Sequence, residues 1–152
     1  MAYVTEEARQ ELLDTIAEAT DELAAALAAL GEAYEQLDEA GADRLEEELF
    51  RPLQSAYGRA KRTHAEFATR HALPPRAFSP GTAGAPSTGV KGFVEAAAEA
   101  VEQAENILVE LQDSMSPVEV GDAELRAGLA DVRATIGDFG ARAERFVSRF
   151  GR

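Results

Sequence analysis

The sequence predicts an all-α protein, an antiparallel up-down-up-down four-helix bundle in which two helical hairpins are joined by a long Pro/Gly-rich loop. Three observations lead to this fold. Four segments repeat apolar residues at alternating steps of three and four, alanine flanks many of these positions, and proline and glycine gather between the second and third segments. We expect a single domain, residues 1–152, because a chain of this length buries one core. The predicted helices span about 5–39, 43–72, 89–114 and 122–150, with the loop at 73–88.

The first hairpin is predicted from its apolar seam and its turn. The seam of the first helix includes Ile16 and Leu30, and the stretch DEAGAD follows it. In this stretch Gly41 is expected to end the first helix and Asp43 to cap the second. Pro52 predicts a kink or a restart within the second helix, because proline clashes with the preceding helical turn.

The second hairpin is predicted from the same kind of pattern. Asp122 is expected to cap the fourth helix, although Ser116, Pro117 and Glu119 also form a capping-box pattern that would start it earlier. The loop at 73–88 is interpreted as a linker that crosses one end of the bundle, or as a proline-rich docking segment.

Charge alternates along the chain. Residues 1–50 hold 15 acidic and two basic residues, and residues 51–91 hold seven basic residues and one acid; residues 92–125 hold nine acids and no base, and residues 126–152 hold six basic and three acidic residues. In an up-down-up-down bundle every acidic helix would lie beside a basic one. We therefore expect acid to face base along each adjacent pair.

Composition excludes several classes of function. The chain has no cysteine, so no thiolate metal site or cysteine nucleophile is expected. Its net charge of −13 argues against binding to nucleic acid or to an anionic membrane. We found no signal peptide or transmembrane pattern, which indicates a cytoplasmic protein. Many arginines, few lysines and abundant alanine and glycine are typical of a bacterium with a GC-rich genome.

The two histidines are the candidate site residues. His64 and His71 lie seven residues apart on the seam of the second helix. One interpretation is that His64 is a core residue hydrogen-bonded to Thr20 or to backbone, with His71 closing the bundle end. The other is that the small residues Thr20, Ala97 and Ala143 leave a pocket around His64 for an apolar ligand or for a metal with water.

The function expected from the sequence is a non-enzymatic protein–protein interaction or scaffold role through helix surfaces. Leu12, Ala19, Ala26 and Ala33 form a second stripe on the first helix, interpreted as a homodimer interface or as a broad core-facing surface of a monomer. We identify no catalytic constellation and expect no cofactor. The alternative function is a carrier of a small apolar ligand or metal at His64.

Overall fold

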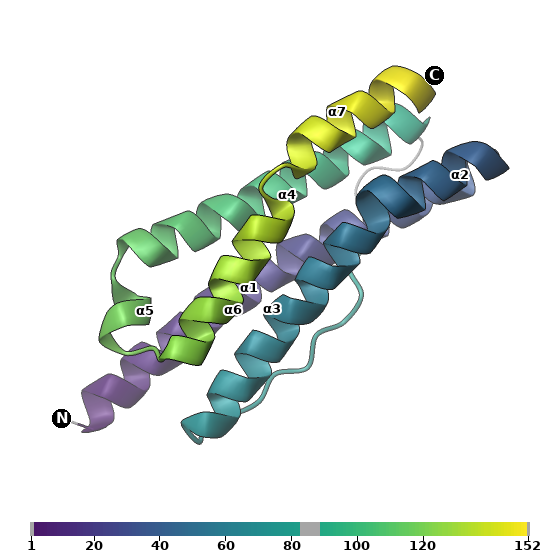
Figure 1. Cartoon of the computed structure of the whole chain (residues 1–152). Coiled ribbons are helices and arrows are strands. Elements are labelled where there is room, and N and C mark those ends of the chain that lie inside the picture. The colour runs from purple at the N-terminus through teal and green to yellow at the C-terminus, as the bar shows by residue number, and fades with distance from the viewer. Residues whose placement is uncertain (1, 83–88, 152) are drawn as a thin grey trace.

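The computed structural model describes residues 2–82 and 89–151, and these residues are helical apart from the connections between helices (Figure 1). The all-α class is confirmed, since no strand occurs in the described ranges. Residues 83–88 of the predicted loop lie outside the described residues. The elements are α1 (Ala2–Glu35), α2 (Glu39–Leu45), the π-helical turn η1 (Glu46–Phe50), α3 (Arg51–Arg70), α4 (Gly89–Asp113), α5 (Ser116–Glu119), α6 (Ala123–Ile136) and α7 (Phe139–Phe150).

The turn after α1 differs from the prediction at Gly41 and Asp43. Helix α1 ends earlier, and Asp38 caps α2 by accepting a hydrogen bond from the backbone N–H of Gly41 at 2.7 Å. Gly41 is buried inside α2, where an added Cβ would lie 3.0 Å from the side chains of Leu37 and Asp38. The glycine therefore does not end the first helix but allows a tight turn to close, and Asp43 lies within α2.

The second helical rod consists of α2, η1 and α3 in direct succession, and the irregularity expected at Pro52 takes the form of the π-helical turn before it. Because proline has no N–H, the carbonyl of Glu48 cannot receive its usual helical hydrogen bond from Pro52. Arg142 of α7 donates to this carbonyl at 3.4 Å. The carbonyl of Glu48, left without its helical donor by the proline, is thus a contact point for α7.

The fourth rod consists of α6 and α7, which are separated by a break at Gly137 and Asp138. Asp122 caps α6 as predicted, accepting from the N–H of Leu125 at 2.8 Å. The alternative start at Ser116 forms only the single turn α5, which follows Met115 in a left-handed conformation (φ 66°).

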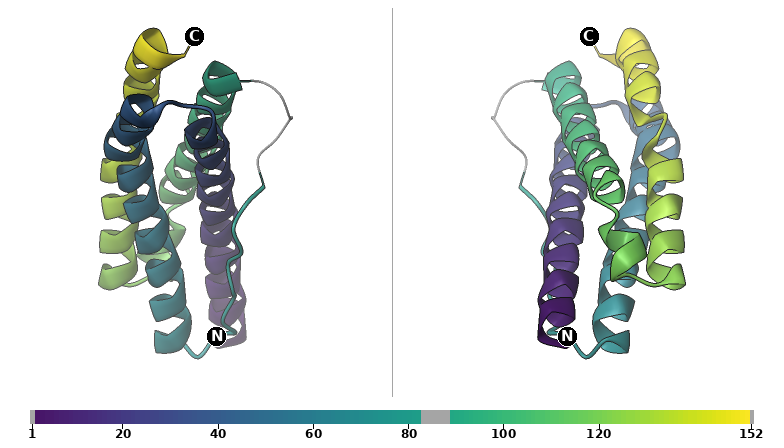
Figure 2. Two further views of the ribbon diagram at one scale, coloured as in Figure 1. Left: turned by 90° about the vertical axis from the view of Figure 1, so that its right-hand side faces the viewer. Right: turned by 90° about the vertical axis from the view of Figure 1, so that its left-hand side faces the viewer.

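The order of the helices is up-down-down-up, so the predicted up-down-up-down arrangement is wrong. Arg9 near the start of α1 donates to the carbonyl of Val120 at 3.0 Å, which places the C-terminal end of α4 beside the N-terminal end of α1. Arg70 at the end of α3 pairs with Asp122 at 2.8 Å, which places this end at the same end of the bundle. The described part of the connection after α3, up to residue 82, therefore runs along the bundle instead of only crossing one end of it (Figure 2).

This order changes which helices are neighbours. α4 packs most extensively on α1, and α3 packs on α6, so acidic α1 lies beside acidic α4. The expectation that acid faces base along every pair is wrong. Each exposed ion pair contributes only about 0–1 kcal/mol, whereas apolar burial contributes about 25 cal/mol per Å². Packing of buried small residues, among them Ala26 of α1 and Ala104 of α4, therefore decides the pairing.

Two seams of the bundle pack less extensively than these pairs. One lies between α1 and α3, and the other lies between α4 and α7. The segment after α3 runs along α1 and covers the first seam (Figure 2). No helix in the described residues is long and apolar enough to span a lipid bilayer.

Candidate functional site

His64 is buried in the core as the first interpretation predicted, at 2% exposure, but its expected hydrogen bond to Thr20 does not form. The hydroxyl of Thr20 donates to the carbonyl of Ile16 at 2.7 Å. Nδ1 of His64 is buried without a hydrogen-bond partner, and the ring lies edge-on to Phe78 with 5.2 Å between ring centroids. The residue that completes the environment of His64 therefore comes from the connection after α3.

The predicted pocket of His64, Thr20, Ala97 and Ala143 is not assembled. Gly128 of α6 lies against Thr63, next to His64, whereas Ala143 lies 15 residues farther along the fourth rod, roughly 20 Å away at 1.5 Å per residue. Ala97 precedes Ala98 in α4, and Ala98 and Ala143 line one concave surface between α4 and α7. The prediction failed because α4 and the fourth rod run in the direction opposite to the one assumed.

The predicted interface stripe is also part of the core. Leu12, Ala19, Ala26 and Ala33 are each 2% exposed or less within a single chain. Because these side chains are covered by the protein itself, they are unavailable to a second copy. The expected homodimer interface at this stripe is therefore wrong, and the alternative of a broad core-facing surface describes these residues.

His71 closes the end of the bundle through Asp122. Its Nε2 lies 2.9 Å from Oδ2 of Asp122, and Arg70 donates two hydrogen bonds to the same carboxylate at 2.8 Å each. Partial burial acts to raise the pKa of Asp122, but the hydrogen bonds from Arg70, from the N–H of Leu125 and from His71 hold this pKa well below its usual range. Asp122 therefore joins the end of α3 to the start of α6, which is a structural role.

A metal site is not formed around either histidine. Within residues 2–82 and 89–151, no group of three or more His, Cys, Asp or Glu side chains is close enough to hold a metal ion. The carboxylate nearest in sequence, Glu66, is exposed on α3.

The segment that covers the α1–α3 seam is called the strap here and consists of residues 76–81. Arg76 forms a two-point ion pair with Asp21 of α1 at 3.0 and 2.8 Å, and its guanidinium lies over the ring of Phe78 at 4.5 Å. A Cβ added to Gly81 would lie 2.6 Å from the backbone N of Ala25. The strap is thus held by one cation, one aromatic ring and one close backbone approach.

The strap also sets the electrostatics at His64. Burial is the largest cause that lowers the pKa of His64, and the positive charge of Arg76 lowers it further. Asp14 of α1 acts in the opposite direction. The folded protein therefore favours the neutral imidazole.

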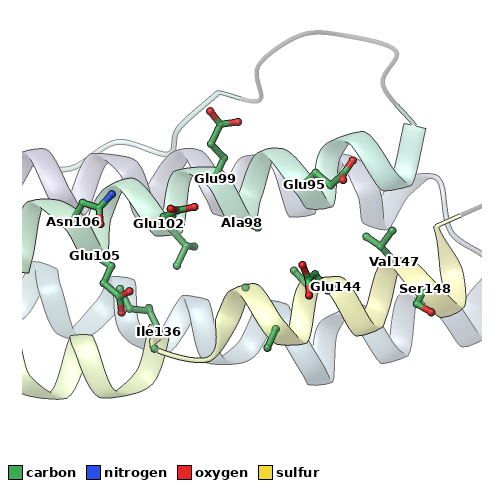
Figure 3. Close-up of a pocket in the computed structure, with 15 residues that line it drawn as sticks. Glu95, Ala98, Glu99, Glu102, Glu105, Asn106, Ile136, Glu144, Val147 and Ser148 are labelled. Atoms are coloured by element: carbon green, nitrogen blue, oxygen red, sulfur yellow. The ribbon is translucent and has the colours of Figure 1, made fainter.

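A concave surface of about 820 Å³ lies between α4 and α7 and is called the α4–α7 groove here (Figure 3). Its apolar and small residues include Ala98 of α4 and Gly140, Ala141 and Val147 of α7. Glu105 and Glu144 lie between the two rods, whereas Glu99 points away from α7. The glutamates that line the groove are Glu95, Glu99, Glu102, Glu105 and Glu144.

These glutamates form a uniformly acidic rim. None of the residues that line the groove is a lysine, arginine, histidine or cysteine. In the described parts of the chain the five glutamates take part in no ion pair, whereas Asp21, Asp122 and Asp131 each pair with an arginine. The groove can therefore bind a cationic group, but it offers no set of nucleophile and base.

Comparisons of the chain with protein-family models, with curated proteins and with solved structures give no match. The functional argument therefore rests on the residues of this chain. Sequence reasoning missed the α4–α7 groove, although one signal pointed to it. Gly137, Gly140 and Ala141 place three small residues within one helical turn and a half of the fourth rod.

Proposed function

We propose that this protein is a non-enzymatic interaction protein that binds a positively charged segment of another protein in the α4–α7 groove. The observation that carries the proposal is the groove itself, an exposed depression with an apolar floor and five unpaired glutamates. Interaction sites combine such an apolar centre with a polar rim. Complementary charge then gives the partner its orientation and speeds its encounter.

The same observation disfavours a second copy of this chain in the groove. The chain has a net charge of −13, so two copies of it repel each other as they approach. The homodimer expected from the alanine stripe also lacks its basis, because that stripe is buried. The proposed partner is therefore a different protein with a basic surface. A cytoplasmic location in a bacterium stays a prediction.

A site-specific photo-crosslinking experiment tests this function. The crosslinking amino acid replaces Ala141, which is exposed on the groove, or Ala127, which is exposed on α6 outside it. We expect a discrete crosslinked product from position 141 in the native host, absent from position 127, and lost when Glu99 and Glu102 are replaced by lysine. Equal products from both positions, or products that survive the charge reversal, would contradict the proposal.

A further inference from the structure

The spacing of the glutamates on the exposed side of α4 bears on the conformation of a bound segment as well as on its charge. Glu95, Glu99 and Glu102 follow each other at steps of four and three, and all three are exposed. Along a helix at 1.5 Å per residue, Glu95 and Glu102 are about 10.5 Å apart. The acidic rim therefore has the seven-residue repeat of a helix surface.

This repeat distinguishes between two kinds of bound segment. A helix that lies along α4 repeats its side chains every seven residues at the same distance of about 10.5 Å, whichever direction it runs. An extended segment places side chains of one face about 6.6 or 13 Å apart. A bound helix therefore matches the spacing of Glu95 and Glu102 more closely than an extended segment does.

The floor of the groove also suits a helix. Gly140 and Ala141 of α7 and Ala98 of α4 line the groove, and a Cβ added to Gly140 would meet no atom within 4 Å. Small side chains on both walls leave room for a third rod to approach. The groove extends along α4 from Glu95 to Asn106, or about 16 Å, which is the length of three helical turns.

The unpaired glutamates themselves favour such a partner. Glu95 and Glu99 are like charges four residues apart, and Glu99, Glu102 and Glu105 are like charges three apart, so each pair repels its neighbour. None of these glutamates forms an ion pair with an arginine or lysine of the described chain. A row of cations on a bound helix would relieve all of it at once.

We infer that the α4–α7 groove binds an amphipathic helix of a partner protein that carries arginine or lysine at positions i, i+3 or i+4, and i+7, next to a row of small apolar residues. This inference rests on the proposed function and names the partner class of the same surface. The partner helix recognises the groove because its cations repeat at the same helical spacing as Glu95, Glu99 and Glu102.

Binding of three designed peptides to the intact protein tests the inference, measured by fluorescence anisotropy at low ionic strength. Each peptide has about 18 residues, a length at which a helix can form on a docking surface. The first carries three arginines at i, i+4 and i+7. The second has the same composition with the arginines spread around the helix, and the third has the same charge but contains prolines that keep it extended. We expect the first peptide to bind about tenfold more tightly than the other two, which corresponds to about 1.4 kcal/mol in binding free energy.

Two charge-reversal variants locate the binding surface. Replacing Glu99 and Glu102 with lysine is expected to abolish binding of the first peptide. Replacing Glu11 and Glu18 of α1 with lysine changes the net charge equally on exposed positions outside the groove, and should leave most of the binding intact. Equal loss in both variants would show attraction to the overall negative field and would overturn the inference.

The outcomes separate the partner class from the function. Tighter binding of the extended peptide, or equal binding of all three, would overturn the helical partner while a groove-specific crosslink at position 141 still supported the proposed function. A failed crosslink together with tight, patterned peptide binding would instead remove the support for a native protein partner.

Discussion

The two loosely packed seams of this bundle differ in what covers them. The α1–α3 seam is covered by the strap, whose Arg76 pairs with Asp21 and whose Phe78 packs on His64. The α4–α7 seam has no such segment among the described residues, and its glutamates have no ion-pair partner there. The α1–α3 seam is therefore completed by a segment that supplies a cation and an apolar contact, and the α4–α7 seam lacks both among the described residues.

The two acidic surfaces have the same spacing but differ in whether the chain supplies a cation. On α1 the exposed carboxylates Asp14, Glu18 and Asp21 follow each other at steps of four and three, as Glu95, Glu99 and Glu102 do on α4. The strap brings Arg76 to Asp21. No lysine or arginine lines the α4–α7 groove.

Truncating the apolar contact of each seam is expected to give the largest difference between them. Phe78→Ala removes a half-buried ring that contacts His64 and Arg76, and we expect a loss of about 1–2 kcal/mol in unfolding free energy. Val147→Ala on the α4–α7 groove removes a smaller, partly exposed side chain and is expected to cost less than about 1 kcal/mol. Urea unfolding of both variants measures the two losses. A larger loss from Val147→Ala would contradict the description of the α1–α3 seam as covered and of the α4–α7 seam as open.

Glycine-to-alanine changes should have opposite signs at the two seams. At Gly81 the new Cβ would lie 2.6–2.7 Å from the backbone of Ala24 and Ala25, so Gly81→Ala must displace the strap and is expected to destabilise by about 1 kcal/mol. At Gly140 the new Cβ meets open space inside a helix, so Gly140→Ala should stabilise by about 0.5–1 kcal/mol. Thermal unfolding of both variants checks the signs. A destabilised Gly140→Ala protein would mean that the groove is already filled.

Local sequence patterns predict where the helices lie in the chain, but they do not predict the direction in which each helix runs. Apolar steps of three and four place the helices, and Asp122 marks a start because a carboxylate there can accept an N–H one turn ahead. The same pattern is satisfied whether α4 runs with or against α3, and a connection as long as 73–88 permits both directions. The alternation of acidic and basic segments favours the up-down-up-down order, but charge is weaker than the burial of residues such as Ala26.

The candidate site was predicted less well than the fold, for a related reason. His64 was placed in the core by its seam position, but contacts made by an irregular segment such as Phe78 have no periodicity to reveal them. The partners assigned to His64, Ala97 and Ala143, followed from the wrong direction of their helices. The groove emerges only once α4 and α7 are known to be neighbours, because its walls are far apart in sequence, 43 residues in the case of Ala98 and Ala141.

Acidification should weaken the covered seam. Burial and Arg76 lower the folded pKa of His64 below its unfolded value of about 6.5. The stabilisation from the neutral ring is thus fully present above that pH and is lost as the pH falls through the folded value. We expect the urea midpoint to fall between about pH 7 and pH 5, and this fall to be reduced in His64→Leu. A midpoint that is flat over this range in the parent protein would show that His64 does not contribute.

The ion pair of the strap is expected to contribute little. Arg76 and Asp21 have side chains 44% and 50% exposed, and an exposed pair contributes about 0–1 kcal/mol. Arg76→Gln should lower stability by a few tenths of a kcal/mol at low salt, and the difference should vanish near 1 M salt, where the screening length is about 3 Å. If the loss persists at high salt, the contact of the guanidinium with Phe78 holds the strap, not its charge.

The smallest expected effect on stability comes from adding a cation to the α4–α7 groove. Ser148 lies on the groove four residues after Glu144, so Ser148→Lys creates a favourable i, i+4 pair and should stabilise the protein by about 0.2–0.5 kcal/mol. The same lysine neutralises part of the acidic rim and should weaken binding of a basic helix. Ser114→Lys, with the same change in charge at an exposed position outside the groove, is the control for binding. If Ser148→Lys stabilised the fold but left peptide binding unchanged, the rim of α7 would not belong to the binding surface, and recognition would reside on α4 alone.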